Sequence, residues 1–250
     1  NIGINHSKGE LVAFLDDDDE WYSDKLMHQI KLFKNEKVGL VYSSIDLFFG
    51  KHNILYSSNP KLKGAIFKNM LLKNYIGATP SVIVRKKALE SIKNTKNQYF
   101  DSSFPARQDY DLWIRICKTW EVDYVKKPLI KQYYRDNINR ISSNLNNHLK
   151  AHELINKKYK NDIEKYLSKN EKDIILINQY SFLAAQSIKI DNIYTARYYY
   201  LKIFKINKSM KFLFIYVLSF LGSKSIILLR KYFRWVILII SKKNYLKLLR

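Results

Sequence analysis

The most concentrated chemistry in this chain is the acidic pentapeptide DDDDE at residues 16–20, which directly follows the apolar run LVAFL at 11–15. The 250 residues include only 22 acidic side chains against 44 Lys and Arg, so this local excess of negative charge stands out. Two carboxylates about 6 Å apart repel by about 3 kcal/mol at an effective dielectric constant of about 20. A divalent cation would relieve that repulsion, and the pentapeptide therefore predicts a metal site.

Several kinds of ligand site use Asp-rich segments, and the neighbouring residues separate them. An EF-hand loop starting at Asp16 would need Gly and Glu where Trp21 and Met27 stand. An Asp-rich diphosphate site on a helix is disfavoured, because residues 11–15 show no helical period. A nucleoside-diphosphate site fits best, since Mg²⁺ or Mn²⁺ takes one or two carboxylates and completes its shell with phosphates and water. A solvated acidic turn without a ligand stays open as the alternative.

The elements that must position the pentapeptide alternate between strands and helices up to about residue 140. Short apolar runs predict strands at 11–15, 38–42 and 81–84, whereas helical periodicity predicts helices that begin at 24 and span 64–74 and 109–118. In the first of these helices, Leu26, Ile30 and Phe33 would form the buried face. The alternation predicts an α/β domain, and open α/β sheets bind ligands at the carboxyl ends of strands, where the pentapeptide lies.

Beyond about residue 145 the pattern becomes helical and basic. Helices are predicted at 173–188 and 193–204, and the final segment KSIILLRKYFRWVILIISKKNYLKLLR mixes apolar residues with Lys and Arg. No apolar run approaches the roughly 20 residues of a membrane span. A basic amphipathic helix of this kind can lie on an anionic membrane, or it can pack on its own domain with a solvated basic face. The sequence leaves both interpretations open.

The formal net charge of +22 predicts a negatively charged partner, such as nucleic acid, an anionic membrane surface or a phosphorylated substrate, unless it serves solubility alone. Nucleic acid is disfavoured, because the basic residues are spread along the chain without a reading motif. Cys117 is the single cysteine, which excludes an internal disulfide and favours a reducing compartment. His148 and His152 have a spacing that suits metal ligation, but no third ligand is evident, so we expect surface residues.

Family resemblance begins at the pentapeptide. Residues 1–21, together with Lys25, Leu26 and Gln29, resemble the central segment of family 2 glycosyltransferases of the GT-A fold. The resemblance implies that a D-x-D element ends a strand and that Asp18 binds the divalent ion, Mn²⁺ or Mg²⁺, which bridges the diphosphate of a sugar nucleotide. It also implies that Asp16 and Asp17 contact the ribose or the waters of the metal, with Asp16 as a second metal ligand. Residues 19–21 are expected to shape the following turn.

A second segment, residues 108–115 (QDYDLWIR) preceded by Phe100-Asp101, resembles the region of the family in which an acidic pair precedes a D-L-W helix. The family usually has Glu-Asp where this chain has Gln108-Asp109, and the resemblance implies Asp109 as the general base. A helix N-terminus lowers the pKa of a carboxylate, whereas burial against aromatic side chains raises it. A helix cap is the structural alternative for Asp109, and the two roles are compatible.

A third segment, Tyr133-Tyr134-Arg135 followed by residues 142–144 (SSN), is similar to the part of the family that closes the catalytic domain beside the diphosphate. It implies that Arg135 binds phosphate oxygens through a fork of hydrogen bonds, with a surface arginine as the alternative. Residues 77–81 (GATPS) resemble the loop under the acceptor.

The resemblance covers residues 1 to about 145 and implies an α/β, GT-A mixed sheet flanked by helices, followed by an all-α C-terminal region. The predicted domains are residues 1–144, catalytic, and residues 145–250, helical and basic. In the family, a strand with a T-Y-N-like turn and an acidic residue that reads the nucleobase precede the D-x-D strand. This chain begins just before that strand, so we expect an N-terminally incomplete catalytic domain.

The implied function is inverting, metal-dependent transfer of a sugar, of the hexosyltransferase type, from a nucleoside-diphosphate sugar to an acceptor hydroxyl in cell-surface glycan or polysaccharide synthesis. The acceptor would be a glycan or a lipid-linked glycan. The basic C-terminal region would hold the enzyme peripherally at the cytoplasmic face of the cell membrane. Two alternatives remain: a catalytically silent, truncated relative, and a basic module that binds a membrane or nucleic acid.

Overall fold

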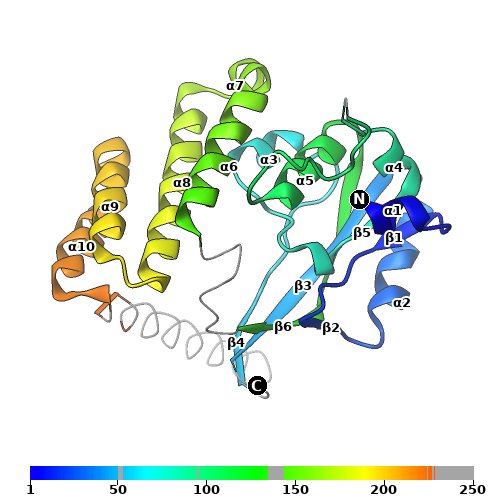
Figure 1. The fold of residues 1–250 in the computed structure, drawn as a ribbon, viewed down its shortest axis with the longest axis horizontal. Coiled ribbons are helices and arrows are strands. Elements are labelled where there is room, and N and C mark those ends of the chain that lie inside the picture. Colours follow the sequence, from blue (N-terminus) through cyan, green and yellow to red (C-terminus); the bar gives the residue numbers. More distant parts are fainter. Residues whose placement is uncertain (50–52, 95, 135–143, 224, 227, 229–250) are drawn as a thin grey trace, which may run out of the picture. The chain divides into compact units, whose positions relative to one another are not determined.

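The computed structural model describes residues 1–49, 53–94, 96–134, 144–223, 225–226 and 228 (Figure 1). The chain divides into two compact units, residues 1–172 and residues 173–250, and each is described by itself. The helices between residues 145 and 166 thus belong to the first unit. The predicted boundary after residue 144 marks the end of a catalytic domain. The division into compact units does not test it, so it stays a prediction.

The first unit is built on a mixed, six-stranded sheet. Its strands are β1 (Leu11–Ala13), β2 (Asp19–Trp21), β3 (Val38–Phe49), β4 (Asn53–Ser57), β5 (Ile83–Arg85) and β6 (Glu121–Tyr134). They lie in the order β1-β5-β3-β6-β2, with β4 paired to β3. The β3–β6 pair is parallel and the other pairs are antiparallel. The predicted mixed sheet is therefore confirmed.

The central strand, β3, was predicted from its apolar run at 38–42. Leu40 and Val41 have no exposed surface and Tyr42 is 1% exposed. A strand that is buried on both faces reads as a continuous apolar run, which explains why the pattern was visible. Helices cover both sides of the sheet, with α3 and α5 on one side and α2 and α4 on the other (Figure 1).

The long strand β6 was not predicted. Lys126, Lys127 and Pro128 interrupt its apolar pattern, and a proline argues against a central strand. The pairing with β3 shifts register between Ser43 and Ser44, and Pro128 lies opposite this irregularity. A local bulge thus accommodates the proline, because ladder pairing is already interrupted there.

The first unit also contains seven helices within its described residues. They are α1 (Ile2–His6), α2 (Lys25–Ile30), α3 (Phe67–Leu72), α4 (Lys86–Glu90), α5 (Gln108–Thr119), α6 (Leu145–Lys158) and α7 (Lys160–Tyr166), with 3₁₀ turns η1 (Lys31–Lys34) and η2 (Thr79–Ser81). The predicted pattern of α5 is confirmed, because Leu112, Trp113 and Ile116 are fully buried.

The predicted buried face of the helix expected to begin at residue 24 is wrong for Leu26 and Ile30, although Phe33, in η1, is buried as predicted. Leu26 and Ile30 are 41% and 47% exposed, whereas Lys25 and Gln29 are completely buried. The Gln29 side-chain amide donates to backbone carbonyl oxygens of β3 and η2 at 3.0 and 2.9 Å, and Lys25 Nζ donates to the Gln29 side-chain oxygen. Satisfying these buried backbone acceptors fixes the inner face of α2, since an unpaired buried carbonyl is costly. Apolar periodicity could not reveal this.

The second unit is helical throughout the part of it that the structure describes. It contains α9 (Ile193–Asn207), α10 (Met210–Leu218) and the 3₁₀ turn η4 (Ser219–Leu221), and α8 (Lys169–Lys189) enters it from the first unit. The predicted helices at 173–188 and 193–204 are confirmed. Asn192 caps α9 by accepting the Thr195 N–H at 3.1 Å. Among the described helices, none combines the length and the apolar character that a membrane crossing requires.

Candidate functional site

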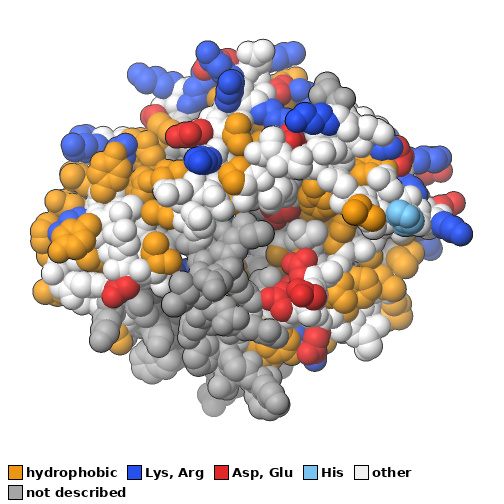
Figure 2. All heavy atoms as spheres, viewed as in Figure 1, with side chains coloured by type: hydrophobic (Ala, Val, Ile, Leu, Met, Phe, Trp, Pro, Cys, Tyr) orange, Lys and Arg blue, Asp and Glu red, His pale blue; other side chains and the backbone are white. Residues whose placement is uncertain are grey.

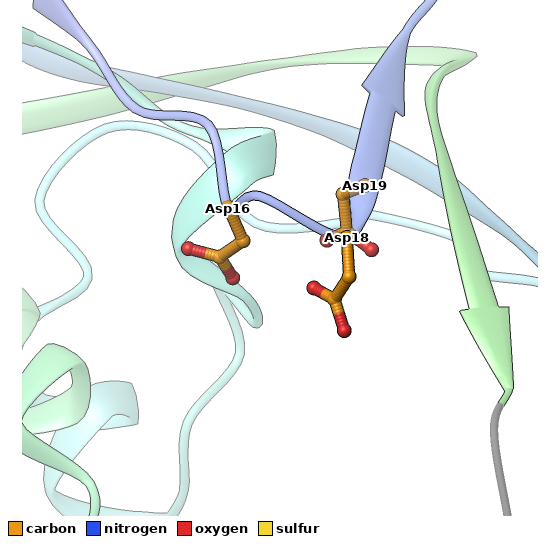
Figure 3. A group of neighbouring side chains, drawn as sticks. All are labelled: Asp16, Asp18 and Asp19. Carbon is orange, nitrogen blue, oxygen red and sulfur yellow. The ribbon is translucent and has the colours of Figure 1, made fainter.

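The loop between β1 and β2 gathers the acidic residues. One carboxylate oxygen from each of Asp16, Asp18 and Asp19 lies within 4.8 Å of the others. The Asp19 N–H donates to the Asp16 carbonyl oxygen at 3.3 Å and closes the turn. Figure 3 shows the carboxylates of Asp16 and Asp18 extending to the same side of the loop. We call residues 16–19 the acidic loop; the three clustered carboxylates among its four form an oxygen-only donor set of the kind that suits Mg²⁺ or Mn²⁺.

Asp19 and Glu20 were expected in a turn, but they form the start of β2. Asp19 is 8% exposed and its carboxylate accepts a hydrogen bond from the Gln132 side-chain amide at 3.2 Å. Glu20 accepts from Lys131 Nζ at 3.1 Å and from the Tyr133 hydroxyl at 3.0 Å. β6 therefore engages the charge of Glu20, whereas Asp19 joins the acidic loop. The sequence could not indicate this because β6 itself was not predicted.

Electrostatics of the acidic loop favour a bound cation. Partial desolvation raises the pKa of Asp16, although much of the residue is exposed, and the neighbouring charges of Asp18 and Asp17 raise it further. A raised pKa means that the carboxylate anion is destabilised where it lies. A divalent cation placed among these oxygens would reverse the sign of the local field and stabilise the ionised form.

Aromatic contacts fasten the acidic loop to the rest of the first unit. The Phe14 ring packs edge-on against Trp113 of α5 and against Phe100, with ring centroids 6.1 and 5.9 Å apart. The Trp21 indole N–H donates to the Phe14 carbonyl oxygen at 3.3 Å, so the two ends of the loop are joined. The Trp113 indole N–H in turn donates to the Gly77 carbonyl oxygen at 3.4 Å. α5 thus contacts both the acidic loop's base and the predicted acceptor loop.

Asp109 lies on α5, four residues before Trp113, and so on the same face of that helix. Burial raises the pKa of its carboxyl, the Tyr110 N–H and the charge of Arg107 lower it, and the charge of Asp16 raises it. The predicted base and the acidic loop are therefore within electrostatic reach of each other. Asp109 is not the N-cap residue, but its carboxylate accepts the Tyr110 N–H at 2.7 Å, so it also satisfies a first-turn donor.

Arg107 is a site residue that the sequence did not reveal. It is the N-cap of α5 with φ 61°, a left-handed conformation that is strained for a residue with a side chain. Its Nη1 donates to His152 Nε2 of α6 at 2.8 Å, and its guanidinium carbon lies 4.9 Å from the centre of the Tyr110 ring. The sequence signal that could have revealed Arg107 is its positive charge two positions before Asp109, the predicted base.

His148 and His152 were expected at the surface, and this is wrong. Both are 5% exposed on the inner face of α6. Burial, and then the charge of Arg107, lower the pKa of His152 to about 3. The imidazole is therefore neutral at physiological pH, and its Nε2 can accept the hydrogen bond from a guanidinium that has only donors.

Among the remaining predicted residues, the structure describes one that is not brought into the cluster. Asp17 is exposed and is not among the three clustered carboxylates. Arg135 lies outside the described residues, as do Ser142 and Ser143. In the predicted acceptor loop, Gly77 has φ +94°, which favours glycine, and the Asn74 side chain accepts its N–H at 2.9 Å.

The first unit is thus an α/β domain in which the acidic loop follows the edge strand β1 and interacts electrostatically with Asp109, a partly buried carboxylate on α5. Residues 1–93 match the model of the family described as Glycosyl transferase family 2, and this match supports the predicted resemblance to that family. The family match, the mixed sheet with flanking helices and the helical C-terminal region together confirm the predicted GT-A fold class.

Curated relatives are also glycosyltransferases by name. An uncharacterized glycosyltransferase of Methanocaldococcus jannaschii is 30% identical over 134 residues, which are 52% of this chain and 44% of the relative. An Escherichia coli protein named UDP-Glc:alpha-D-GlcNAc-diphosphoundecaprenol beta-1,3-glucosyltransferase is 28% identical over 148 residues, 58% of this chain and 53% of the relative. The chain thus spans about half the length of these relatives.

Among solved structures, S. aureus TarS 1-349 is similar in outline. It is 10% identical, with a TM-score of 0.42, over 84% of this chain and 69% of that protein.

Proposed function

We propose that this chain transfers a sugar from a nucleoside-diphosphate sugar to an acceptor hydroxyl, with inversion and with Mn²⁺ or Mg²⁺ as cofactor. The observation that carries the proposal is the acidic loop, in which carboxylate oxygens of Asp16, Asp18 and Asp19 lie within 4.8 Å of one another, in electrostatic reach of Asp109. The family match of residues 1–93 supports it. Family 2 chemistry needs a metal-diphosphate site and a base on opposite sides of one anomeric carbon, and this pairing of charges suits both.

Asp18 and Asp16 would hold the cation, with Asp19 behind them anchored by Gln132. A bound divalent ion supplies Lewis-acid stabilisation of the charge that develops on the leaving nucleoside diphosphate. Asp17, exposed beside them, remains our candidate for a ribose contact, and Arg135 remains a candidate for phosphate oxygens. Their roles are proposals drawn from the family resemblance.

Asp109 would act as the general base. Its carboxylate takes the proton of the acceptor hydroxyl while the acceptor oxygen bonds to the anomeric carbon and the bond to the diphosphate oxygen breaks. Burial raises the pKa of Asp109, which makes the ionised carboxylate more basic than a solvated one. Arg107 opposes this shift and would keep the base ionised at neutral pH.

The donor and acceptor classes follow from the relatives and from charge. The Escherichia coli relative is named for a UDP-Glc donor and a diphosphoundecaprenol-linked GlcNAc acceptor. We propose a nucleotide-sugar donor and a glycan or lipid-linked acceptor for this chain as well. Its single cysteine, Cys117, is buried and free, as suits a reducing compartment, and we propose a location at the cytoplasmic face of a membrane, which the basic C-terminal region also suits.

The decisive experiment measures nucleoside-diphosphate release from a panel of sugar nucleotides, with and without Mn²⁺. We expect nucleoside-diphosphate release by the wild-type chain to depend on the metal. Asp18→Asn should lower the rate of release by about a hundredfold or more. Glu36→Gln removes an exposed carboxylate elsewhere in the first unit and should keep wild-type activity. Equal activity of Asp18→Asn and wild type would overturn the metal assignment.

The same experiment distinguishes the proposed enzyme from a catalytically silent relative. That alternative draws on Gln108, which stands where the family usually has Glu. A silent relative would release no nucleoside diphosphate from any donor. A basic binding module would, in addition, show no rise in melting temperature with Mn²⁺ and a nucleoside diphosphate, whereas an enzyme should show one.

A further inference from the structure

α10 presents apolar side chains to solvent instead of burying them. None of its residues is buried. Met210, Phe214 and Val217 are 70%, 54% and 57% exposed, and Leu221 in the following 3₁₀ turn is 73% exposed. Spacings of four, three and four residues place these side chains along one face of the helix. We call these four residues the apolar stripe; Figure 2 shows hydrophobic side chains at the surface over α9 and α10.

Positive charge surrounds the apolar stripe. Lys205, Lys208 and Lys211 are exposed at the end of α9 and the start of α10. In the sequence from 173 onward the acidic residues are Asp173 and Asp191, and none follows Asp191. The apolar stripe and the residues around it therefore carry positive charge. After Asp191, the sequence of this unit contains no carboxylate that would offset it.

Aromatic side chains on α9 and η4 extend the same kind of surface. Tyr194 and Tyr198 are 78% and 53% exposed, and Lys202 Nζ lies 4.6 Å from the centre of the Tyr198 ring. Arg197 lies over the Phe220 ring at 3.8 Å, and Phe220 is 59% exposed. Tyrosine and cation pairs of this type are favoured at the boundary between lipid headgroups and acyl chains, where one end of the side chain is apolar and the other is hydrated.

We propose that the apolar stripe, with Lys205, Lys208 and Lys211, docks the C-terminal unit onto the surface of an anionic lipid bilayer. A nine-residue helix is only about 14 Å long, less than half of the roughly 30 Å hydrocarbon core, so it would lie in the interface plane rather than span it. Apolar side chains would enter the headgroup–acyl boundary while the lysines pair with lipid anions.

Charge decides between a bilayer and the other surfaces that could cover the stripe. A second copy of this chain packed stripe to stripe would bring two basic surfaces together, because Lys205, Lys208 and Lys211 lie beside the stripe in each copy, which is repulsive. The segment 229–250 contains Lys and Arg but no acidic residue, so it would also bring like charges together over the stripe. An anionic lipid surface is the occupant whose charge is complementary.

Vesicle co-sedimentation of the full chain tests the proposal, with phosphatidylcholine vesicles and with vesicles that contain phosphatidylserine. Met210→Ser/Phe214→Ser should weaken binding to the anionic vesicles at least tenfold. The matched control is Met27→Ser/Ile54→Ser, whose side chains in the first unit are 66% and 54% exposed; its binding should stay within twofold of wild type. Equal losses in the two variants, or no binding by the wild type, would overturn the proposal.

A charge pair of variants sharpens the test. Lys208→Glu/Lys211→Glu should lose at least about fivefold per lysine on anionic vesicles and nothing on neutral ones. Lys34→Glu/Lys37→Glu changes the net charge equally at exposed positions of the first unit and should bind as the wild type does. Equal losses in the two charge variants would mean that net charge alone governs binding, and would overturn the proposal.

Two further outcomes identify another occupant. If Met210→Ser/Phe214→Ser dissociates a dimer in sedimentation velocity but leaves vesicle binding unchanged, the stripe is a protein interface. If truncation after Leu228 raises vesicle binding severalfold, residues 229–250 cover the stripe. Either result overturns the proposal. Docking does not depend on sugar transfer, because Asp18→Asn should bind vesicles normally; failure of one proposal is thus distinguishable from failure of the other.

Discussion

Two helices of this chain, α5 in the first unit and α10 in the second, treat apolar side chains in opposite ways. α5 of the first unit buries Leu112, Trp113 and Ile116 completely, whereas α10 of the second unit buries none of its residues. The first unit uses its core to hold charged groups in fixed positions. The second keeps apolar surface in contact with solvent, although burying it would stabilise the fold. This difference indicates that the role of the first unit depends on internal packing and that of the second on an exposed surface.

The largest expected effect belongs to the carboxylate that α5 holds near the acidic loop. Asp109→Asn should lower acceptor-dependent nucleoside-diphosphate release by about a hundredfold to ten-thousandfold, because the general base is lost. Isothermal titration should show that metal-dependent binding of the nucleoside diphosphate persists. Glu36→Gln is again the control for loss of one negative charge. Turnover of Asp109→Asn at the wild-type rate would exclude Asp109 as the base.

The packing of the first unit is tested next by Trp113→Ala. This substitution removes a fully buried indole that contacts Phe14 and donates to Gly77, so the free energy of unfolding should fall by about 3–5 kcal/mol. Urea unfolding followed by circular dichroism measures the change. A loss below about 1 kcal/mol would mean that the site of Trp113 collapses without cost and that α5 does not support the acidic loop as we describe.

A smaller effect should appear as a pH dependence of stability in the first unit. Burial lowers the pKa of His152 to about 3, whereas an unfolded histidine titrates near pH 6.5. The unfolded chain therefore binds more protons between these values, and stability declines as the pH falls below about 6.5. Between pH 7 and pH 5 the free energy of unfolding should fall by up to about 2 kcal/mol from this residue.

His152→Gln keeps an acceptor for Arg107 but cannot titrate, so it should remove this contribution to the pH dependence. His6→Gln, at an exposed position, is the control and should leave the pH dependence unchanged. The comparison is made by urea unfolding at pH 5, 6 and 7. An identical pH slope in His152→Gln and wild type would contradict the neutral, buried state of His152.

The smallest effect is expected in the second unit. Phe214→Ala removes an exposed ring and should change the free energy of unfolding by less than about 0.5 kcal/mol, because no core contact is lost. The same urea unfolding experiment applies in the absence of lipid. A destabilisation comparable to that of Trp113→Ala would show that α10 packs internally, and the contrast between the two units would disappear.

Much of this fold was predictable because its central elements carry periodic apolar patterns. The run at Leu40–Tyr42, the face of α5 with Leu112 and Trp113, and the helices of the second unit all follow from such patterns. The acidic loop was predictable from charge alone, because like charges are crowded there without a structural reason. β6 was missed because Lys126, Lys127 and Pro128 lie at its centre.

The rest of the site depends on contacts between distant residues that no local pattern encodes. Gln29 bonds to the carbonyl oxygen of Ser81, and Arg107 bonds to His152 across 45 positions of the chain. Polar contacts of this kind determine which face of α2 is buried, and they accompany the burial of the histidines of α6. The apolar pattern of the sequence predicts neither result. Only the folded chain brings these donors and acceptors together.

The contact between Phe14 and Trp113 has a consequence for how this site could change over time. Asp16 follows Phe14 by two residues, and Asp109 precedes Trp113 by about one helical turn, so one aromatic pair supports both carboxylates. A substitution in either ring should displace both groups together, and its effect should depend on which residue occupies the other position. Lineages of this protein should accordingly show covariation of positions 14 and 113.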